Sequence, residues 1–331
     1  MRETERPEAT PDAGPSAAEQ AGRPPRAGRW RRALLVPLAL VVAAAAWYGG
    51  GAFYVHVVDD DPAFGRTLEV EPGASRAVAV AAALIAREVD RHRWVANDPW
   101  FLPGAALDNM PNYQQGIVYA LSRFAVELTD RLARVRGSSQ IDADADEAAG
   151  RLKYPGDVWI FEWSTTPVQP SSESQYRKAR AALERYNARL ARGEAVFDRR
   201  ADNLRDTLDR FASDLGSASA AIDEQIRRGA GTLLDLGADD LFYANKGRLY
   251  AYHLLLEALG EDFREVIAER NLETVWRETV EALAEAAALD PWWVVNGGLD
   301  SSVLPNHLAA QGFLLLRART RLREIVDILQ K

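Results

Sequence analysis

Apolar and polar positions follow two different patterns along this 331-residue chain. Residues 33–58 carry no charged side chain, whereas beyond them apolar residues recur every three or four positions. That spacing places apolar side chains on one face of a helix. We therefore predict an all-α fold, in which a single N-terminal transmembrane helix precedes a bundle of about seven or eight helices, one of them long.

The longest periodic run begins at a capping box opened by Ser172. Apolar residues then recur at steps of three and four as far as Leu215, and two consecutive steps of four end at Ala201. Such an eleven-residue unit locally unwinds a left-handed supercoil. We expect one long helix to Leu215, in which Gly193 is a candidate bend, followed by a stop and restart at Gly216.

The other periodic runs predict helices at about residues 75–93, 108–135, 142–152, 239–259, 272–289 and 305–330. The strand-like run at 157–164 has no partner strand, so we expect an extended segment laid over helices. Trp94, Trp100 and Phe101 lie in an irregular stretch. They either enter a nearby bilayer surface or cover the core beneath a long loop, and the second interpretation is favoured.

The uncharged run divides the chain into four parts. Residues 1–32 have almost no large apolar side chains and are expected to be a disordered cytoplasmic tail. Residues 33–58 are long enough to span a bilayer, 59–73 form a short stalk, and 74–331 form the helical domain. Arginines before the apolar run and acids after it predict that the N-terminus stays in the cytoplasm. A cleaved signal peptide is the alternative, but the run exceeds the usual 7–15 apolar residues, so we expect a retained signal-anchor.

Composition excludes several classes of function. The chain has no cysteine, so disulfides, thiolate metal sites and cysteine nucleophiles are ruled out. Its four histidines lack the spacing of a metal motif, and no catalytic or nucleotide-binding motif occurs. A net charge of −8 argues against nucleic acid as a partner. We therefore predict no catalytic residue, no metal and no cofactor, and we favour a protein that is not an enzyme.

Polar side chains on apolar faces are the remaining candidates for a site. If their elements meet, they form a polar cluster in apolar surroundings, either a pocket for a small polar ligand or an acid–base histidine with a tuned pKa. The alternative is a hydrogen-bonded network that fixes the register of the helices, and it is favoured because buried polar groups are usually satisfied structurally. The candidates are Lys246, His253, Asn296, Asn306, His307 and Gln311.

Four blocks of sequence together resemble one known family. They are LDNMPN (107–112), RRADNLRDTLDRFASDLGS (199–217), DLFYANKGRLYAYHLLL (240–256) and LPNHLAAQGFLLLRART (304–320). The family consists of single-pass proteobacterial membrane proteins, domain-of-unknown-function family 2333, and the resemblance extends over 33–331. It implies a protein of the bacterial inner membrane with a helical periplasmic domain. It implies no activity, substrate or catalytic residue.

Two functional hypotheses follow. The preferred one is a membrane-anchored scaffold or adaptor that binds an unknown envelope protein through exposed helix faces. The alternative is an envelope enzyme or small-ligand sensor that uses a polar cluster around His253 and His307. A homodimer is open, because a heptad stripe packs either against a second copy or within the chain.

Overall fold

The computed structural model describes residues 27–134, 140–161, 168–229, 235–298 and 304–331, with side chains from Leu34 onward. Within these ranges the backbone is mainly helical and contains no strand, which confirms the all-α prediction. The chain divides into two compact units, residues 1–47 and 48–331, and each is described separately.

The uncharged run is helical. It comprises α1 (Ala27–Ala45), a π-helical turn (Ala46–Gly50) and α2 (Gly51–Val55). Of the helices that the structure describes, this one is long and apolar enough to cross a membrane, over Leu34–Val55, and a signal sequence would meet the same criterion.

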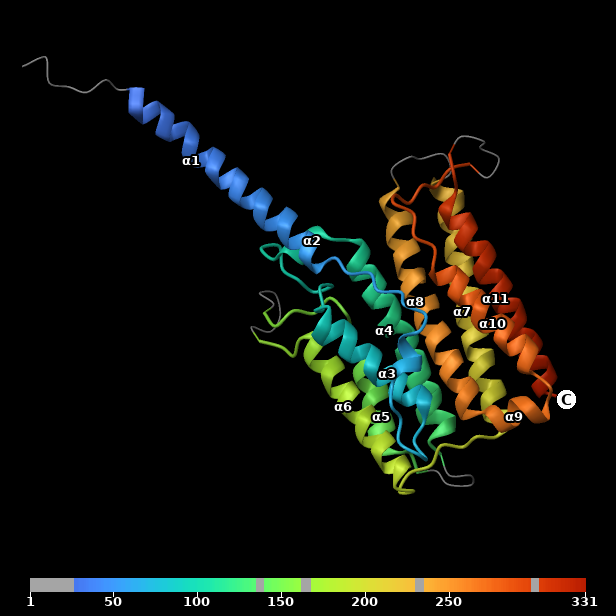
Figure 1. Cartoon of the computed structure of the whole chain (residues 1–331). Helices are drawn as coiled ribbons and strands as arrows, with labels where there is room; N and C mark the ends of the chain where they lie inside the picture. Colours follow the sequence, from blue (N-terminus) through green and yellow to red (C-terminus); the bar gives the residue numbers. More distant parts are fainter. Residues whose placement is uncertain (1–26, 135–139, 162–167, 230–234, 299–303) are drawn as a thin grey trace, which may run out of the picture. The chain divides into compact units, whose positions relative to one another are not determined.

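The second unit contains two groups of helices (Figure 1). The first group consists of α3 (Arg76–Ala86), α4 (Asn109–Glu127), α5 (Ala143–Leu152) and α6 (Ser172–Ala191). The second consists of α7 (Ala201–Gly229), α8 (Leu236–Asp262), α9 (Arg264–Glu269), α10 (Glu273–Ala287) and α11 (His307–Leu329). Helix α8 is the link, because it packs on α3 and α4 of the first group and on α7, α10 and α11 of the second.

The closest approach between the groups is the crossing of α4 and α8. A β-carbon on Gly247 would overlap the carbonyl oxygen of Tyr113, and one on Gly116 would overlap the carbonyl oxygen of Ala244. The two glycines therefore let the backbones meet without side chains between them. Short-range packing of this kind gives α8 little freedom to shift along α4.

The prediction of one long helix that reaches Leu215 without a break is wrong. Helix α6 ends at Ala191, and α7 begins at Ala201. Gly193 lies between them with φ of +71° and no atom near the place of a β-carbon, so it ends α6 in the left-handed conformation rather than bending a continuous helix. Apolar side chains on both sides of the break enter the same core, which is why their spacing continues across it.

The stop predicted at Gly216 is also wrong, because α7 continues to Gly229. The glycine instead leaves room for Arg319 of α11, whose Nε donates to the carbonyl oxygen of Ala212 at 3.2 Å. The apolar stripe of α11 is buried within the chain rather than left for a second copy.

The irregular stretches divide by burial. Trp94 is buried in the core, as the favoured interpretation expected, but Trp100 is 80% exposed and Phe101 43%. Residues 157–161 form no strand and are held to the N-terminus of α6, since Ser172 donates its backbone N–H to Val158 at 3.0 Å. The rest of the strand-like run, 162–164, lies outside the described residues.

Candidate functional site

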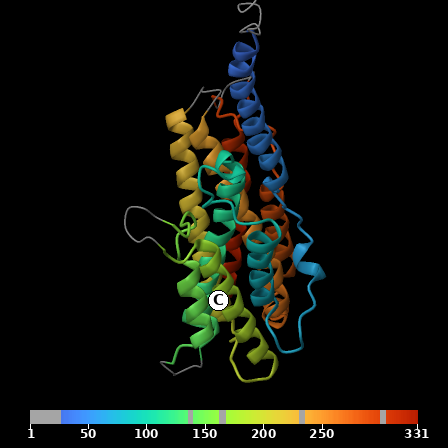
Figure 2. The same ribbon diagram turned by 90° about the vertical axis from the view of Figure 1, so that its left-hand side faces the viewer.

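The segment expected to be a stalk, residues 59–73, lies against the helical domain. It continues from α2 and turns back into α3 (Figure 2). Between these helices it passes along α8. Its composition favours this course, because Pro62 and Gly65 interrupt any helix longer than the short 3₁₀ turn Phe64–Thr67. Gly65 is buried, where a β-carbon would lie 3.3 Å from Val80 of α3.

Successive side chains of α8 bind successive residues of the stalk. The Nζ of Lys246 lies 2.6 Å from Oδ2 of Asp60 and donates to the carbonyl oxygen of Leu289 at 2.8 Å. One turn later, the Tyr250 hydroxyl donates to the carbonyl oxygen of Asp61 at 2.8 Å. Spacings of three or four residues place side chains on one face of a helix, so the stalk follows a single stripe of α8 in the same direction as the helix.

His253 continues this stripe with an unusual pair of contacts. Its Nε2 lies 3.2 Å from the carbonyl oxygen of Pro62, and its Nδ1 lies 3.1 Å from that of Val280 in α10. Carbonyl oxygens only accept hydrogen bonds, and a neutral imidazole has one N–H. The neutral ring therefore donates to one carbonyl at a time, whereas the imidazolium donates to both.

The surface of α8 that contacts the stalk and the start of α3 is here named the seat. Ionic contacts extend this seat toward the end of α8. Glu257 pairs with Arg66, whose Nη2 lies 2.7 Å from Oε1. Asp262 then accepts from the Ser75 hydroxyl at 2.7 Å and from the backbone N–H of Arg76 and Ala77 at 2.9 and 3.0 Å. A carboxylate is favoured at the N-terminus of a helix. Burial nevertheless raises the pKa of Asp262, although those three donors oppose the shift. From Lys246 to Asp262 the seat covers about 24 Å of helix.

A buried ionic cluster lies beneath Asp59, at the π-helical turn Arg87–Arg91 that follows α3. Arg87 contacts Oε1 of Glu88 at 2.7 Å, Oδ1 of Asp59 at 3.4 Å and the Tyr250 hydroxyl at 2.7 Å. Its guanidinium also lies 4.7 Å from the centre of the Phe64 ring, a cation–π contact. Burial opposes the charge, but the nearby Glu88 carboxylate holds the pKa of Arg87 above its ordinary value. This cluster connects the turn after α3 to the stalk through the Arg87–Asp59 ion pair, in which Asp59 is partly exposed, and to α8 through the Tyr250 hydroxyl.

The other predicted residues form a second group, at the start of α8 and α11. Asn296 donates to Asp235 Oδ2 at 3.0 Å and to the Gln225 carbonyl oxygen at 3.1 Å. Asn306 donates to Asn296 Oδ1 at 3.0 Å, while its own Oδ1 accepts from Ala309 and caps α11.

His307 belongs to this second group, because its Nδ1 accepts the backbone N–H of Val295 at 3.0 Å. That contact requires a ring whose Nδ1 carries no proton, and burial lowers the pKa of His307 accordingly.

The six predicted residues therefore do not form one cluster. Gln311 donates to the carbonyl oxygen of Phe242 at 3.0 Å, about 16 Å along α8 from His253. Lys246 and His253 both contact the stalk. The other group, Asn296, Asn306 and His307, connects α7 with the starts of α8 and α11. The polar atoms in both groups bind mostly to this chain's own backbone. No set of three or more acidic or histidine side chains that fits a metal ion is found in the described part of the chain.

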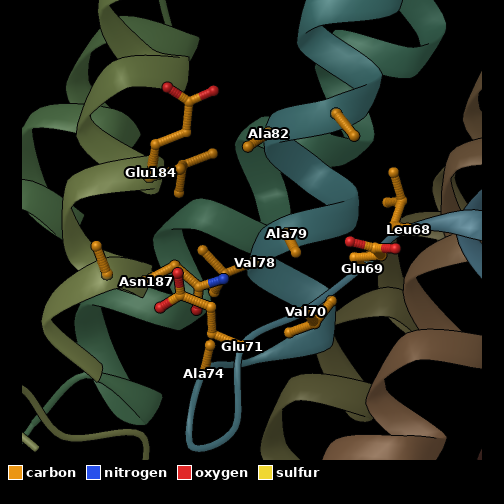
Figure 3. Close-up of a pocket in the computed structure, with 13 residues that line it drawn as sticks. Leu68, Glu69, Val70, Glu71, Ala74, Val78, Ala79, Ala82, Glu184 and Asn187 are labelled. Carbon is orange, nitrogen blue, oxygen red and sulfur yellow. The ribbon is translucent and has the colours of Figure 1, made fainter. Parts of the chain in front are cut away.

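An open groove lies beside the far end of the stalk (Figure 3). It has a volume of about 300 Å³ between residues 68–74, α3 and α6. Alanines and Val78 form its floor, while Glu69, Glu71 and Glu184 are its charged lining residues. Three carboxylates without a basic residue among the lining would disfavour an anionic ligand.

Sequence reasoning missed Arg87, Glu88 and Asp60 as members of the site. A charged pair beside the otherwise apolar face of α3 was the available signal for the first two. In the sequence, the acids of the stalk indicate only the orientation in the membrane. Their partners lie as far as 186 residues away along the chain, so no local pattern relates them.

Comparison with known proteins gives one match. No curated protein and no solved structure matches the chain. A family described as "Uncharacterized protein conserved in bacteria (DUF2333)" matches residues 33–231, which include two of the four sequence blocks and end before the other two. Since this match covers more than half of the 331 residues, the chain belongs to domain-of-unknown-function family 2333, a family of uncharacterized bacterial proteins.

Proposed function

We propose that this protein is a membrane-anchored scaffold or adaptor of the bacterial envelope. The apolar helix Leu34–Val55 is its anchor in the inner membrane. Five arginines between residues 23 and 32 precede that helix, and Asp59–Asp61 follow it, which favours a cytoplasmic N-terminus and a periplasmic helical domain. Its partner is an unknown envelope protein that binds exposed helix faces. A homodimer stays a prediction, and the burial of the α11 stripe within the chain does not favour it.

The observation that carries this proposal is the seat of the stalk on α8. A domain that only needed tethering would be served by a flexible linker, whose composition is rich in glycine and serine. Here the stalk is fixed by contacts with the buried side chains of Lys246, Tyr250 and His253. The exposed ion pair between Arg66 and Glu257 adds to them, and Asp262 holds the start of α3, just after the stalk. Such an attachment holds the domain in a defined position relative to the residue where the stalk begins. A defined position is useful to a protein that presents a binding face at a fixed place above a membrane.

The test compares how much of a partner protein is recovered with the natural stalk and with a lengthened, flexible one. The full-length protein in native membranes is crosslinked and purified, alongside a variant with six glycine and serine residues inserted after Val57. A matched insertion after Gly193, in the exposed turn between α6 and α7, is the control. We expect the wild-type protein and the control to recover the same specific partner, and the tether variant to recover less of it. Equal recovery by all three, or no partner above background, would refute the role of a fixed scaffold.

The alternative, an envelope enzyme or small-ligand sensor, cannot use His253 and His307 together, because the two residues lie in separate groups. What supports it instead is a cavity beside the second polar group. Asp235, the partner of Asn296, lines a cavity of about 250 Å³ together with Trp292, Trp293 and Asp239. Burial, with repulsion from Asp108, raises the pKa of Asp239 to about 6. Indole rings and carboxylates together suit a small organic cation.

Tetramethylammonium is a suitable probe for this alternative. It should change the tryptophan fluorescence of the wild-type protein in a saturable way, and that of a Trp292→Ala variant less. Identical titrations of the two proteins would exclude the cavity as the binding site.

A further inference from the structure

Besides the apolar helix itself, an exposed apolar surface lies next to the end of that helix. It consists of Trp100, Phe101, Trp159, Ile160 and Phe161, and is here named the apolar platform. Phe101 contacts Trp159 with ring centres 5.7 Å apart, and Trp159 contacts Phe161 at 5.4 Å. Trp100 is 80% exposed and Phe161 52%. A single exposed apolar side chain is common on soluble proteins and needs no explanation. Several large ones gathered on one exposed surface, by contrast, indicate a binding surface.

The backbone beneath the platform is firmly held. Asn97 donates from Nδ2 to the carbonyl oxygen of Val158 at 2.8 Å, which joins the two segments that carry the apolar side chains. Gln169 donates its backbone N–H to Ile160 at 3.0 Å and its side-chain amide to Trp159 at 3.2 Å. The exposed side chains are therefore presented by a fixed backbone rather than by a loose chain end.

The platform is continuous with the last two turns of the apolar helix. The Tyr48 hydroxyl donates to the carbonyl oxygen of Trp100 at 2.6 Å. Helix α2 packs on the 3₁₀ turn Pro103–Ala106, and Gly51 is the residue that allows contact with Pro103. On α2 itself, Phe53 and Tyr54 are 89% and 84% exposed. These rings and the platform together present tryptophan, tyrosine and phenylalanine beside the exit of a membrane helix.

We propose that the apolar platform rests in the lipid interface of the membrane in which α1 and α2 are anchored. Tryptophan and tyrosine favour that interface, because an amphipathic ring places its apolar body among acyl chains and its polar atom among headgroups. The platform would thus be a second membrane contact, which fixes the rotation of the domain about its anchor. This inference rests on the proposed membrane anchorage, and it goes further by assigning lipid to a surface of the helical domain.

The absence of cysteine allows a direct test. Single variants Trp100→Cys, Ile160→Cys and Phe161→Cys of the full-length protein are labelled with a nitroxide and placed in phosphatidylcholine nanodiscs. Collision with oxygen, which concentrates in lipid, is compared with collision with a water-soluble nickel chelate. Val42→Cys reports on the anchor, and Phe313→Cys, an exposed aromatic position on α11, is the matched control. Circular dichroism checks that each labelled variant keeps its helical content.

We expect the oxygen-to-nickel collision ratio at all three platform positions to exceed that at residue 313 severalfold and to approach that at residue 42. A high ratio is a lipid signal and a low ratio is a water signal. A lipid signal at 42 with a water signal on the platform would overturn this inference and leave the anchor intact. A water signal at 42 would overturn the anchor, and with it the proposed function. Protection of the platform from both reagents would indicate a protein partner there and would also overturn the lipid assignment, as would a lipid signal at 313.

Discussion

The ion pair between Lys246 and Asp60 is expected to be energetically asymmetric. The Lys246 side chain is 0% exposed and that of Asp60 is 35% exposed. In Asp60→Ala, the buried ammonium group keeps only the Leu289 carbonyl as a partner, and loss of the counter-charge from a buried pair costs about 3–5 kcal/mol. In Lys246→Met, the carboxylate left behind remains partly hydrated, and a cost of about 2 kcal/mol comes mainly from the Leu289 carbonyl that loses its donor. Removal of the more exposed partner should therefore destabilise the protein more.

Urea unfolding of the full-length protein in detergent at neutral pH, followed by circular dichroism, measures these costs. The double variant Asp60→Ala/Lys246→Met should lose less than the two single losses added, because the buried charge has gone. Asp61→Ala is the matched control, since Tyr250 binds the backbone carbonyl at this position rather than the side chain. If Lys246→Met cost as much as Asp60→Ala, or if both cost under about 0.5 kcal/mol, a desolvated ammonium group would not dominate this site.

Three further predictions address the helix crossing, the turn after α6 and the second polar group. Gly247→Ala should cost about 2–3 kcal/mol, because the added methyl group overlaps the Tyr113 carbonyl, and an unchanged Tm would contradict so close an approach. Gly193→Ala should lower the free energy of unfolding by about 1 kcal/mol, because residue 193 has a φ of +71° that alanine adopts poorly. Gly193→Asn should lower it less, since asparagine tolerates this conformation better. Equal Tm values for the two variants would argue against backbone strain. Burial lowers the pKa of His307, so the stability that its neutral ring provides is present above the ordinary pKa of about 6.5 and is lost as the pH falls through the folded value. His307→Asn, whose side-chain oxygen can still accept from Val295, should remove that part of the acid sensitivity, and parallel pH curves for the two proteins would contradict this role.

The approximate positions of most helices were determined by the sequence itself, because helix formation depends largely on neighbouring residues. Ser75 and Asp142 cap the helices that follow them, and the stripes of α7 and α11 enter the core as their spacing predicts. The apolar run likewise predicted a helix of membrane-spanning length from composition alone. The break at Gly193 was not predictable from periodicity, because both adjoining helices pack against one core and keep their spacing in phase.

The candidate site depended on the tertiary structure. The sequence placed Lys246 and His253 on one stripe, and it did so correctly, but it gave them His307 as a neighbour instead of the stalk. Spacing along a helix determines which side chains share a face, whereas the partner of that face is set by how distant segments pack. Asp60 meets Lys246 across 186 residues of sequence, and only the fold brings the two charges together. The same packing separates Trp94, which it buries, from Trp100, which it leaves exposed beside the apolar helix.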